Sequence, residues 1–218
     1  MNYDSVPLRD FKELNDWETV IFVYQSALKQ VETKIDILNG EFQHRHKYNP
    51  IEHVKSRIKT PESIVKKLKR HGYESSIVNM VRYVNDIAGI RISCSFTSDI
   101  YLIADMISKQ NDLTILARRD YMKNPKKSGY RSYHMLVTTP VFLSDSIIDT
   151  KVEIQIRTVA QDFWATLEHK MHYKFEGDGP DYITKELREC ARYVAELDTR
   201  MEELNNEIQK YGKLSDKK

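Results

Sequence analysis

The sequence has only two cysteines and no long apolar segment. Cys94 lies in an apolar, strand-like run and Cys190 in a helical one, without metal or redox spacing, so both are predicted to be buried free thiols with no disulfide. No stretch approaches the roughly 18 uninterrupted apolar residues of a membrane span, and the polar opening MNYDSVPLRDFKELND has no signal-peptide core. We therefore expect a cytosolic protein without membrane contact.

Common nucleotide-binding and hydrolase motifs are absent as well. There is no P-loop, G-x-G-x-x-G, H-E-x-x-H, G-x-S-x-G or C-x-x-C motif, so any phosphate must be held by side chains rather than by a glycine-rich loop. Two histidine pairs have spacings that suggest a metal: His169 with His172, beside Glu168, and His44 with His46. Neither pair has a third ligand at a recognisable spacing, so a zinc site is not expected.

The small net charge of +2 hides two basic segments. Residues 53–71 contain seven lysines and arginines against one acid, and residues 118–131 contain six against one. Either segment alone is explained most simply as a solvated surface. Together, in a chain of nearly balanced charge, they indicate that a polyanionic ligand is bound at one place.

Hydrophobic periodicity predicts an α+β fold with a mixed sheet, because strands and helices do not alternate as they do in a doubly wound sheet. The predicted helices cover residues 17–39, 61–71, 75–84, 98–110, 159–174 and 181–212. The predicted strands cover residues 86–96, 113–122, 130–143 and 151–158. The pattern indicates one domain over 17–212, with tails at 1–16 and 213–218, and a turn at EGDGPD, residues 176–181. The last helix has an apolar seam that we expect to pack on the first helix or on another subunit.

Two acids precede or begin the polar faces of predicted strands. Asp86 comes just before the strand that carries Arg91, and Glu153 begins the polar face of EIQIR. An acid in such a position is often only a surface residue. Combined with many lysines and arginines for phosphate oxygens, however, two carboxylates suit Mg²⁺. This inventory is what the transfer of a phosphoryl group between two nucleotides requires.

Five blocks of sequence resemble one known family. In this order and spacing, IEHVKSRIKTPESIVKKL, DIAGIRI, RDYMKNPKKSGYRSYH, VEIQIRT and DFWATLEHKMHYK are similar to the synthetase domain of RelA/SpoT alarmone synthetases. The resemblance covers roughly residues 17–210 and is greatest to stand-alone small synthetases, more to the RelP type than to the RelQ type. Since no His-Asp dipeptide is present, we expect synthesis without the hydrolase activity of longer members.

The resemblance implies a nucleotidyltransferase-like fold and a (p)ppGpp synthetase (GTP pyrophosphokinase) of the bacterial stringent response. Such an enzyme moves the β,γ-pyrophosphate of ATP to the 3′-hydroxyl of GDP or GTP, giving ppGpp or pppGpp and AMP. By carry-over, Arg57 and Arg91 would sandwich the adenine of ATP. Lys59, Ser63 and Lys67 would hold the ATP phosphates.

The two acids take the catalytic roles in this resemblance. Asp86 and Glu153 would bind Mg²⁺, the implied cofactor, and Glu153 would also receive the proton of the attacking hydroxyl. A free carboxylate has a pKa of about 4.3 and is a weak base towards an alcohol. Positioning and the metal must therefore supply most of the rate.

The acceptor nucleotide would lie on the strip KKSGYRSYHM, residues 126–135. Tyr130 would stack on guanine, and Asp162, where some relatives have asparagine, would accept hydrogen bonds from the guanine edge. Lys126, Arg119 and His134 are candidates for the 5′-phosphates of GDP or GTP. Alternation predicts that Tyr130, Ser132 and His134 share one strand face.

Two other functions and an assembly are considered at this point. A nucleotide-adding nucleotidyltransferase would normally show a D-x-D pair after a Gly-Ser turn, and neither is present. An RNA-binding regulatory module would use the same basic segments, but two retained acids would repel RNA phosphates. The resemblance also implies a homotetramer, with packing of the terminal helices within one subunit as the simpler alternative.

Overall fold

The computed structural model describes residues 16–174 and 181–215. Residues 176–180 of the predicted turn, residues 1–15 of the first tail and residues 216–218 of the last lie outside the described residues, and the last residue of the predicted turn, Asp181, begins a helix. In chain order, the elements are α1 (Trp17–His46), β1 (Ile51–Ile58), α2 (Pro61–Arg70), α3 (Ile77–Tyr83), β2 (Ala88–Cys94), α4 (Thr97–Ser108), β3 (Thr114–Asp120), β4 (Tyr133–Phe142), β5 (Ile147–Thr158), α5 (Val159–Lys174) and α6 (Asp181–Ser215).

The five strands form one sheet in the order β1-β2-β5-β4-β3. Only β2 and β5 run parallel, and the other pairs are antiparallel, so the predicted mixed sheet is confirmed. Strand β1 was not predicted. Among its eight residues only Ile51 is buried, because β1 lies at the edge and exposes its charged side chains. Charged edge strands are a common protection against pairing with other chains.

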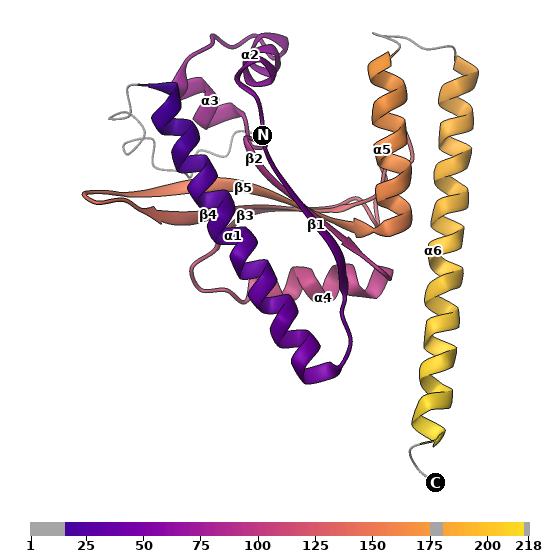
Figure 1. Ribbon diagram of the computed structural model, residues 1–218. Coiled ribbons are helices and arrows are strands. Elements are labelled where there is room, and N and C mark those ends of the chain that lie inside the picture. The colour runs from indigo at the N-terminus through magenta and orange to yellow at the C-terminus, as the bar shows by residue number, and fades with distance from the viewer. Residues whose placement is uncertain (1–15, 175–180, 216–218) are drawn as a thin grey trace.

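One face of the sheet carries the main core. Val152, Ile154 and Ile156 of β5 are completely buried and belong to the same cluster as residues of α1 and α4. Figure 1 shows α1 lying across the sheet, with α4 beside it. Burying one such side chain stabilises the fold by about 1.5–3 kcal/mol. Because side chains alternate along a strand, the residues between these three point to the opposite face, which is free for a binding site.

The caps of the first two helices show how the sequence sets their ends. Asp16 accepts a hydrogen bond from the backbone N–H of Thr19 at 2.7 Å, and α1 ends at His46, with Lys47 as its C-cap at φ 51°. The predicted end at residue 39 was wrong, since Gly40 is accommodated within the helix at a cost of about 1 kcal/mol. Thr60 caps α2 as predicted, with Pro61 as its first residue.

Helix α6 packs on α5 and α4, and Figure 1 shows it on the opposite side of the molecule from α1. Of the two alternatives considered from the sequence, packing of the terminal helices on each other within one subunit is therefore wrong. Cys190 is exposed, which corrects its predicted burial, whereas Cys94 is buried. Four residues of the apolar seam of α6 are exposed: Leu197, Met201, Leu204 and Ile208.

Within residues 16–174 and 181–215, no helix is long and apolar enough to cross a membrane.

Candidate active site

Two adjoining cavities lie on the face of the sheet opposite α1. The inner cavity, of about 220 Å³, is bounded by β1, β2 and β5. The outer cavity, of about 540 Å³, extends to the loop before β4 and to α5. Five side chains line both cavities: Arg57, Asp86, Arg91, Glu153 and Gln155. Four of these are predicted site residues, and three more predicted residues line the outer cavity: Lys126, Tyr130 and His134.

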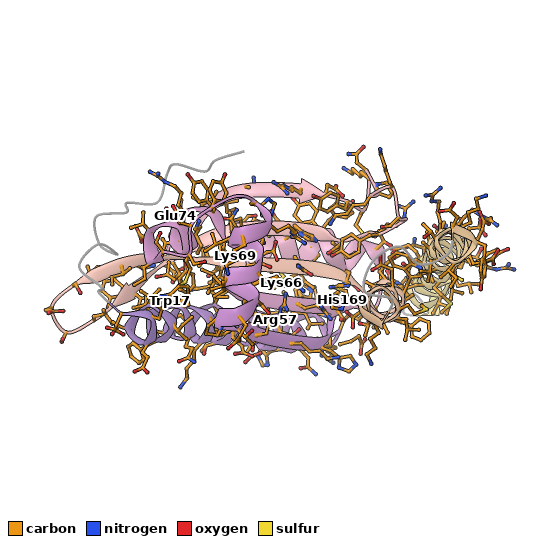
Figure 2. The ribbon with its side chains drawn as sticks, turned by 90° about the horizontal axis from the view of Figure 1, so that it is seen from above. Trp17, Arg57, Lys66, Lys69, Glu74 and His169 are labelled. Atoms are coloured by element: carbon orange, nitrogen blue, oxygen red, sulfur yellow. The ribbon has the colours of Figure 1, made fainter. Side chains whose placement is uncertain are left out.

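Helix α5 forms one wall of the outer cavity. In Figure 2, Arg57 marks the β1 side of this region and His169 the α5 side, and both line the outer cavity. Arg57 lies opposite Gly89 in the pairing of β1 with β2. A Cβ atom on Gly89 would be 3.9 Å from Cγ of Arg57, so the arginine stem passes over the glycine.

Asp86 is held by two lysines from different elements. Its Oδ2 accepts from Lys59 Nζ at 2.9 Å, and its Oδ1 accepts from Lys67 Nζ, on α2, at 2.6 Å. Lys59 is fixed by its backbone N–H, which donates to the carbonyl of Ile87 at 2.8 Å. Burial opposes ionisation of Asp86, but the hydrogen bonds from Lys67 and Lys59 outweigh it and lower the Asp86 pKa to about 2. The carboxylate is therefore ionised at neutral pH.

Glu153 is the end point of a row of polar side chains along β5. Arg157 Nη2 donates to Gln155 Oε1 at 2.9 Å, and Gln155 Nε2 donates to Glu153 Oε2 at 2.8 Å. His134 Nδ1 lies 3.7 Å from the other Glu153 oxygen. Burial raises the Glu153 pKa, but His134 and the Gln155 amide outweigh this effect and keep it below its ordinary value. Glu153 is therefore an oriented, ionised carboxylate.

Tyr130 is located in a loop, because β4 begins three residues later, at Tyr133. The shared-face prediction is confirmed for Tyr130 and His134, since the Tyr130 hydroxyl lies 2.9 Å from His134 Nε2. Cations lie over the Tyr130 ring: Lys126 Nζ is 4.7 Å and the Arg157 guanidinium 5.7 Å from its centroid. A base that stacks on this ring would compete with them.

Ser132 does not share this environment. It is completely buried, and its hydroxyl donates to the backbone carbonyl of Ile156 at 3.1 Å. The prediction that places Ser132 on one face with Tyr130 and His134 was made for a regular strand, and it fails for Ser132 because Tyr130 and Ser132 precede β4.

Asp162, in the first turn of α5, faces two arginines. Its Oδ1 lies 3.4 Å from Arg91 Nη1 and 3.5 Å from Arg157 Nε. This oxygen is buried and has no hydrogen bond of good geometry within the described residues. Asp162 is not among the residues that line either cavity, so it lies behind the two arginines.

Two further predicted residues lie beside the cavities rather than in them. Arg119, on β3, is paired with His134 on β4 and lines a separate cavity of about 60 Å³ together with His134 and Glu153. Ser63 lies in the first turn of α2, where its hydroxyl is 3.0 Å from that of Thr60. It lines neither cavity.

The prediction missed several residues of the cavity walls. Gln155 and Arg157 could have been found, because they alternate with Glu153 on one strand. The α5 residues could not, since helical periodicity does not show which face meets a sheet. The residues missed are Lys55, Gln155, Arg157, Glu168, His169 as a cavity residue, and Lys170.

Within the described parts of the chain, histidine, cysteine and acidic side chains form no group of three or more that could hold a metal. His44 and His46 lie in the last turn of α1, outside both cavities. The His172 side chain lies outside the described residues. A metal ion in the cavities would therefore be bound by Asp86 and Glu153 together with oxygen atoms of another bound ligand.

Comparison with known proteins gives consistent results. The model of the region found in RelA / SpoT proteins matches residues 56–178. The GTP pyrophosphokinase YwaC of Bacillus subtilis is 45% identical over 195 residues, 89% of this chain and 93% of that protein. YjbM of the same organism, also a GTP pyrophosphokinase, is 35% identical over 88% of this chain and 90% of its own.

Solved structures are similar throughout the fold. Small alarmone synthetase 2 from Bacillus subtilis is 44% identical with a TM-score of 0.80, covering 88% of this chain and 99% of its own. Small alarmone synthetase 1 from Bacillus subtilis, bound to its product pppGpp, is 34% identical with a TM-score of 0.82, covering 88% and 98%. The resemblance predicted from five sequence blocks is therefore confirmed, and the chain belongs to the RelA/SpoT family of alarmone synthetases.

Proposed function

We propose that this protein is a (p)ppGpp synthetase, a GTP pyrophosphokinase that transfers the β,γ-pyrophosphate of ATP to the 3′-hydroxyl of GDP or GTP. The observation that carries this proposal is the composition of the paired cavities. Two ionised carboxylates, Asp86 and Glu153, lie among arginines and lysines on one face of the sheet. The relatives YwaC and YjbM are both named GTP pyrophosphokinases.

The inner cavity suits the donor, ATP. Arg57 and Arg91 lie on adjacent strands and line it, so their guanidinium planes are available to enclose an adenine. A relative of known structure, small alarmone synthetase 1, is bound to AMPCPP, an ATP analogue. Lys59 and Lys67 would exchange the Asp86 carboxylate for ATP phosphates, with Ser63 nearby at the start of α2.

The outer cavity suits the acceptor, GDP or GTP. Tyr130 offers a ring for guanine, while Lys126 and His134 are placed to meet phosphates, with Arg119 behind His134. Asp162 is retained as the candidate for guanine selectivity through its Oδ2, because Oδ1 faces Arg91 and Arg157. In this assignment, Asp162 can select guanine only if its contacts with Arg91 and Arg157 weaken when the nucleotide binds.

Glu153 is the proposed general base. Its carboxylate is ionised and oriented by Gln155, so it can accept the proton of the 3′-hydroxyl as that oxygen attacks the β-phosphorus of ATP. The bond between the α,β-bridging oxygen and the β-phosphorus breaks, and AMP leaves with that oxygen. The lowered pKa makes Glu153 a weak base, so most of the acceleration must come from positioning and charge neutralisation.

The residues present fit Mg²⁺. Asp86 and Glu153 are ionised oxygen ligands that line the same cavities, and Mg²⁺ is commonly bound by one or two carboxylates plus substrate phosphates. When bound, Mg²⁺ would neutralise phosphate charge and polarise the transferred group. The lysines that now hold Asp86 keep its carboxylate ionised until then.

The uncovered seam of α6 supports a homo-oligomer, and we assign it to the homotetramer implied by the family resemblance. Leu197, Met201 and Leu204 are each about half exposed and lie at helical spacing. Light scattering of the purified protein should give four times the 25.7 kDa chain mass. A monomer at micromolar concentration would remove the tetramer from the proposal.

The reaction is tested by incubating the protein with ATP, GDP and Mg²⁺ and separating the nucleotides. AMP and ppGpp should form in equal amounts. A product that carries adenylate would instead support a nucleotide-adding transferase. Absent turnover with salt-sensitive RNA binding would support an RNA-binding module. Neither alternative has an observation in its favour.

Two variants test the assigned roles. Glu153→Gln keeps the shape of the side chain but removes the base. Turnover should therefore fall about 1000-fold while nucleotide binding is retained. An active Glu153→Gln enzyme would remove Glu153 from the mechanism. Asp162→Ala should weaken GDP binding and leave ATP binding unchanged, and equal losses for both nucleotides would reassign Asp162.

A further inference from the structure

Helix α6 touches the acceptor loop, residues 121–132, at a place where no side chain fits. Gly129 has φ +93°, and a Cβ atom built on it would be 2.5 Å from Cβ of Ala191 on α6. Ala191 is only 2% exposed. Position 129 therefore requires glycine for two reasons, the backbone conformation and the close approach of α6. The residue after Gly129 is Tyr130.

A small cluster joins Tyr130 to α6. Trp164 and Ala165 of α5 pack with Ala191 in a cluster separate from the main core, and Tyr130 packs against it. The Trp164 indole N–H donates to the backbone carbonyl of Leu187, also on α6, at 2.9 Å. Tyr130 and the α5 residues Trp164 and Ala165 therefore pack on α6 in this separate cluster, whereas Met122, at the start of the acceptor loop, belongs to the main core.

A second contact lies two turns further along α6. The Asp198 carboxylate accepts from the Thr158 hydroxyl at 2.8 Å and from Gln161 Nε2 at 3.0 Å. Thr158 is the last residue of β5, directly after Arg157, and its hydroxyl also accepts from the backbone N–H of Gln161. Asp198 therefore fixes the junction at which α5 leaves the strand that carries Glu153 and Arg157.

We propose that α6 positions the acceptor side of the active site, and that Ala191 and Asp198 are the residues through which it acts. This inference rests on the proposed function, because it assigns the acceptor nucleotide to the outer cavity. Neither residue lines that cavity. Ala191 acts through the loop that carries Tyr130, and Asp198 acts through the β5–α5 junction.

The proposal predicts different effects on the binding of the two substrates. The donor residues come from β1, α2, β2 and the loops beside them, whereas the contacts of Ala191 and Asp198 described above go to the acceptor loop, α5 and the end of β5. A purely structural role for α6 would lower stability and affect both substrates together. A positioning role for the acceptor changes the KM for GDP while the KM for ATP stays nearly constant.

The first experiment replaces Asp198 with alanine and measures both KM values, with kcat and a thermal melt. Losing two hydrogen bonds to a carboxylate should raise the KM for GDP roughly threefold to thirtyfold. Asp198→Asn should restore most of the loss, because its amide oxygen can accept from the same donors. Glu202→Ala is the matched control: Glu202 lies one turn further along α6 and accepts from the Ser98 backbone N–H of α4 at 3.1 Å, so the KM for GDP should not change.

The second experiment is a pair of substitutions at the close approach. Gly129→Ala should raise the KM for GDP, and adding Ala191→Gly should recover part of the loss. After Ala191→Gly the nearest remaining neighbours of a Cβ at 129 are at 3.8 Å and 4.0 Å. The unrecovered part reports the backbone strain at φ +93°. If Asp198→Ala does not fold, the Gly129→Ala variant and its combination with Ala191→Gly still test the proposal.

The inference is overturned if active wild-type protein is obtained and the Asp198 and Gly129 variants leave the KM for GDP unchanged. It is equally overturned if they change the KM values for ATP and GDP by the same factor, or if Glu202→Ala matches Asp198→Ala. If the wild-type protein forms no ppGpp, the proposed function itself fails. The two failures are therefore distinguished by the wild-type assay.

Discussion

Replacing Lys151 with methionine should change how the stability of this protein depends on pH. Lys151 lies on β5, on the same face as Glu153, and is only 1% exposed. Its ammonium donates to Asn85 Oδ1 at 2.8 Å and to the carbonyl of Arg82 at 3.2 Å. Within the described residues it is in no ion pair. Burial therefore lowers the pKa of Lys151 from 10.5 to about 8.

The sign and size of the effect follow from proton linkage. Between pH 8 and 10.5, Lys151 is protonated in the unfolded chain and neutral in the folded one, so the unfolded state binds more protons and stability rises with pH. Below about pH 8, both states are protonated, and the folded state bears the full cost of the buried charge. A pKa change from 10.5 to about 8 corresponds to about 3 kcal/mol.

The assay is urea unfolding of the wild-type protein and of Lys151→Met at pH values from 7 to 11. Because all other groups titrate in both proteins, the difference between their free energies of unfolding isolates Lys151. The free energy of unfolding of the wild-type protein minus that of Lys151→Met should increase by about 3 kcal/mol between pH 7 and 11. Lys109→Met is the control, because the Lys109 side chain is 71% exposed. The difference in unfolding free energy between the wild-type protein and Lys109→Met should stay nearly constant with pH.

A difference for Lys151→Met that stays constant within about 1 kcal/mol from pH 7 to 11 would refute this reasoning. It would mean that the Lys151 ammonium is as well solvated in the folded protein as in the unfolded chain. The two hydrogen bonds would then have to compensate for burial completely.

Three further predictions concern other parts of the fold. Ellman's reagent should modify one thiol in the native protein, Cys190, and a second, Cys94, only after denaturation, because Cys94 is completely buried and burial raises its pKa. The lowered Asp86 pKa contributes up to about 2 kcal/mol of stability above pH 4 that disappears as the pH falls towards 2. Lys67→Met should lose part of this acid-dependent stability in urea titrations at pH 2 to 6, whereas an unchanged profile would refute the assignment. Ile64→Ala should lower the free energy of unfolding by about 2–5 kcal/mol, because Ile64 is completely buried; a loss below 1 kcal/mol would contradict this burial.

Elements with a buried stripe were predictable from sequence. Helix α5 has the predicted bounds, and the alternation of Ile90, Ile92 and Cys94 identified β2 correctly. Strand β1 was missed because periodicity detects a strand by its buried face, and β1 has almost none. The same exposure leaves Arg57 accessible to a ligand. The feature that makes β1 suitable for the site is therefore the one that removed its signal.

Contacts between distant elements were less predictable. The motif blocks located Lys59, Lys67 and Asp86 in one site, but they did not show that both lysines pair with the Asp86 carboxylate. The position of Asp162 behind Arg91 also depends on how α5 leaves β5, which α6 controls through Asp198. Spacing along the chain contains no information on these arrangements, since they are set by packing of helices on one another.

The polar face of β5 shows where sequence inference ends. Lys151 and Glu153 are two residues apart on one face of one strand, and alternation assigns them the same environment. In the fold, the last turn of α3 and the segment after it cover Lys151 with Arg82 and Asn85, whereas Glu153 lines both cavities. The difference between a structural lysine and a catalytic carboxylate is thus set by the end of a helix and a loop about 70 residues earlier in the chain. A polar strand face alone therefore predicts that some of its residues are buried by the fold and others reach a ligand, but not which.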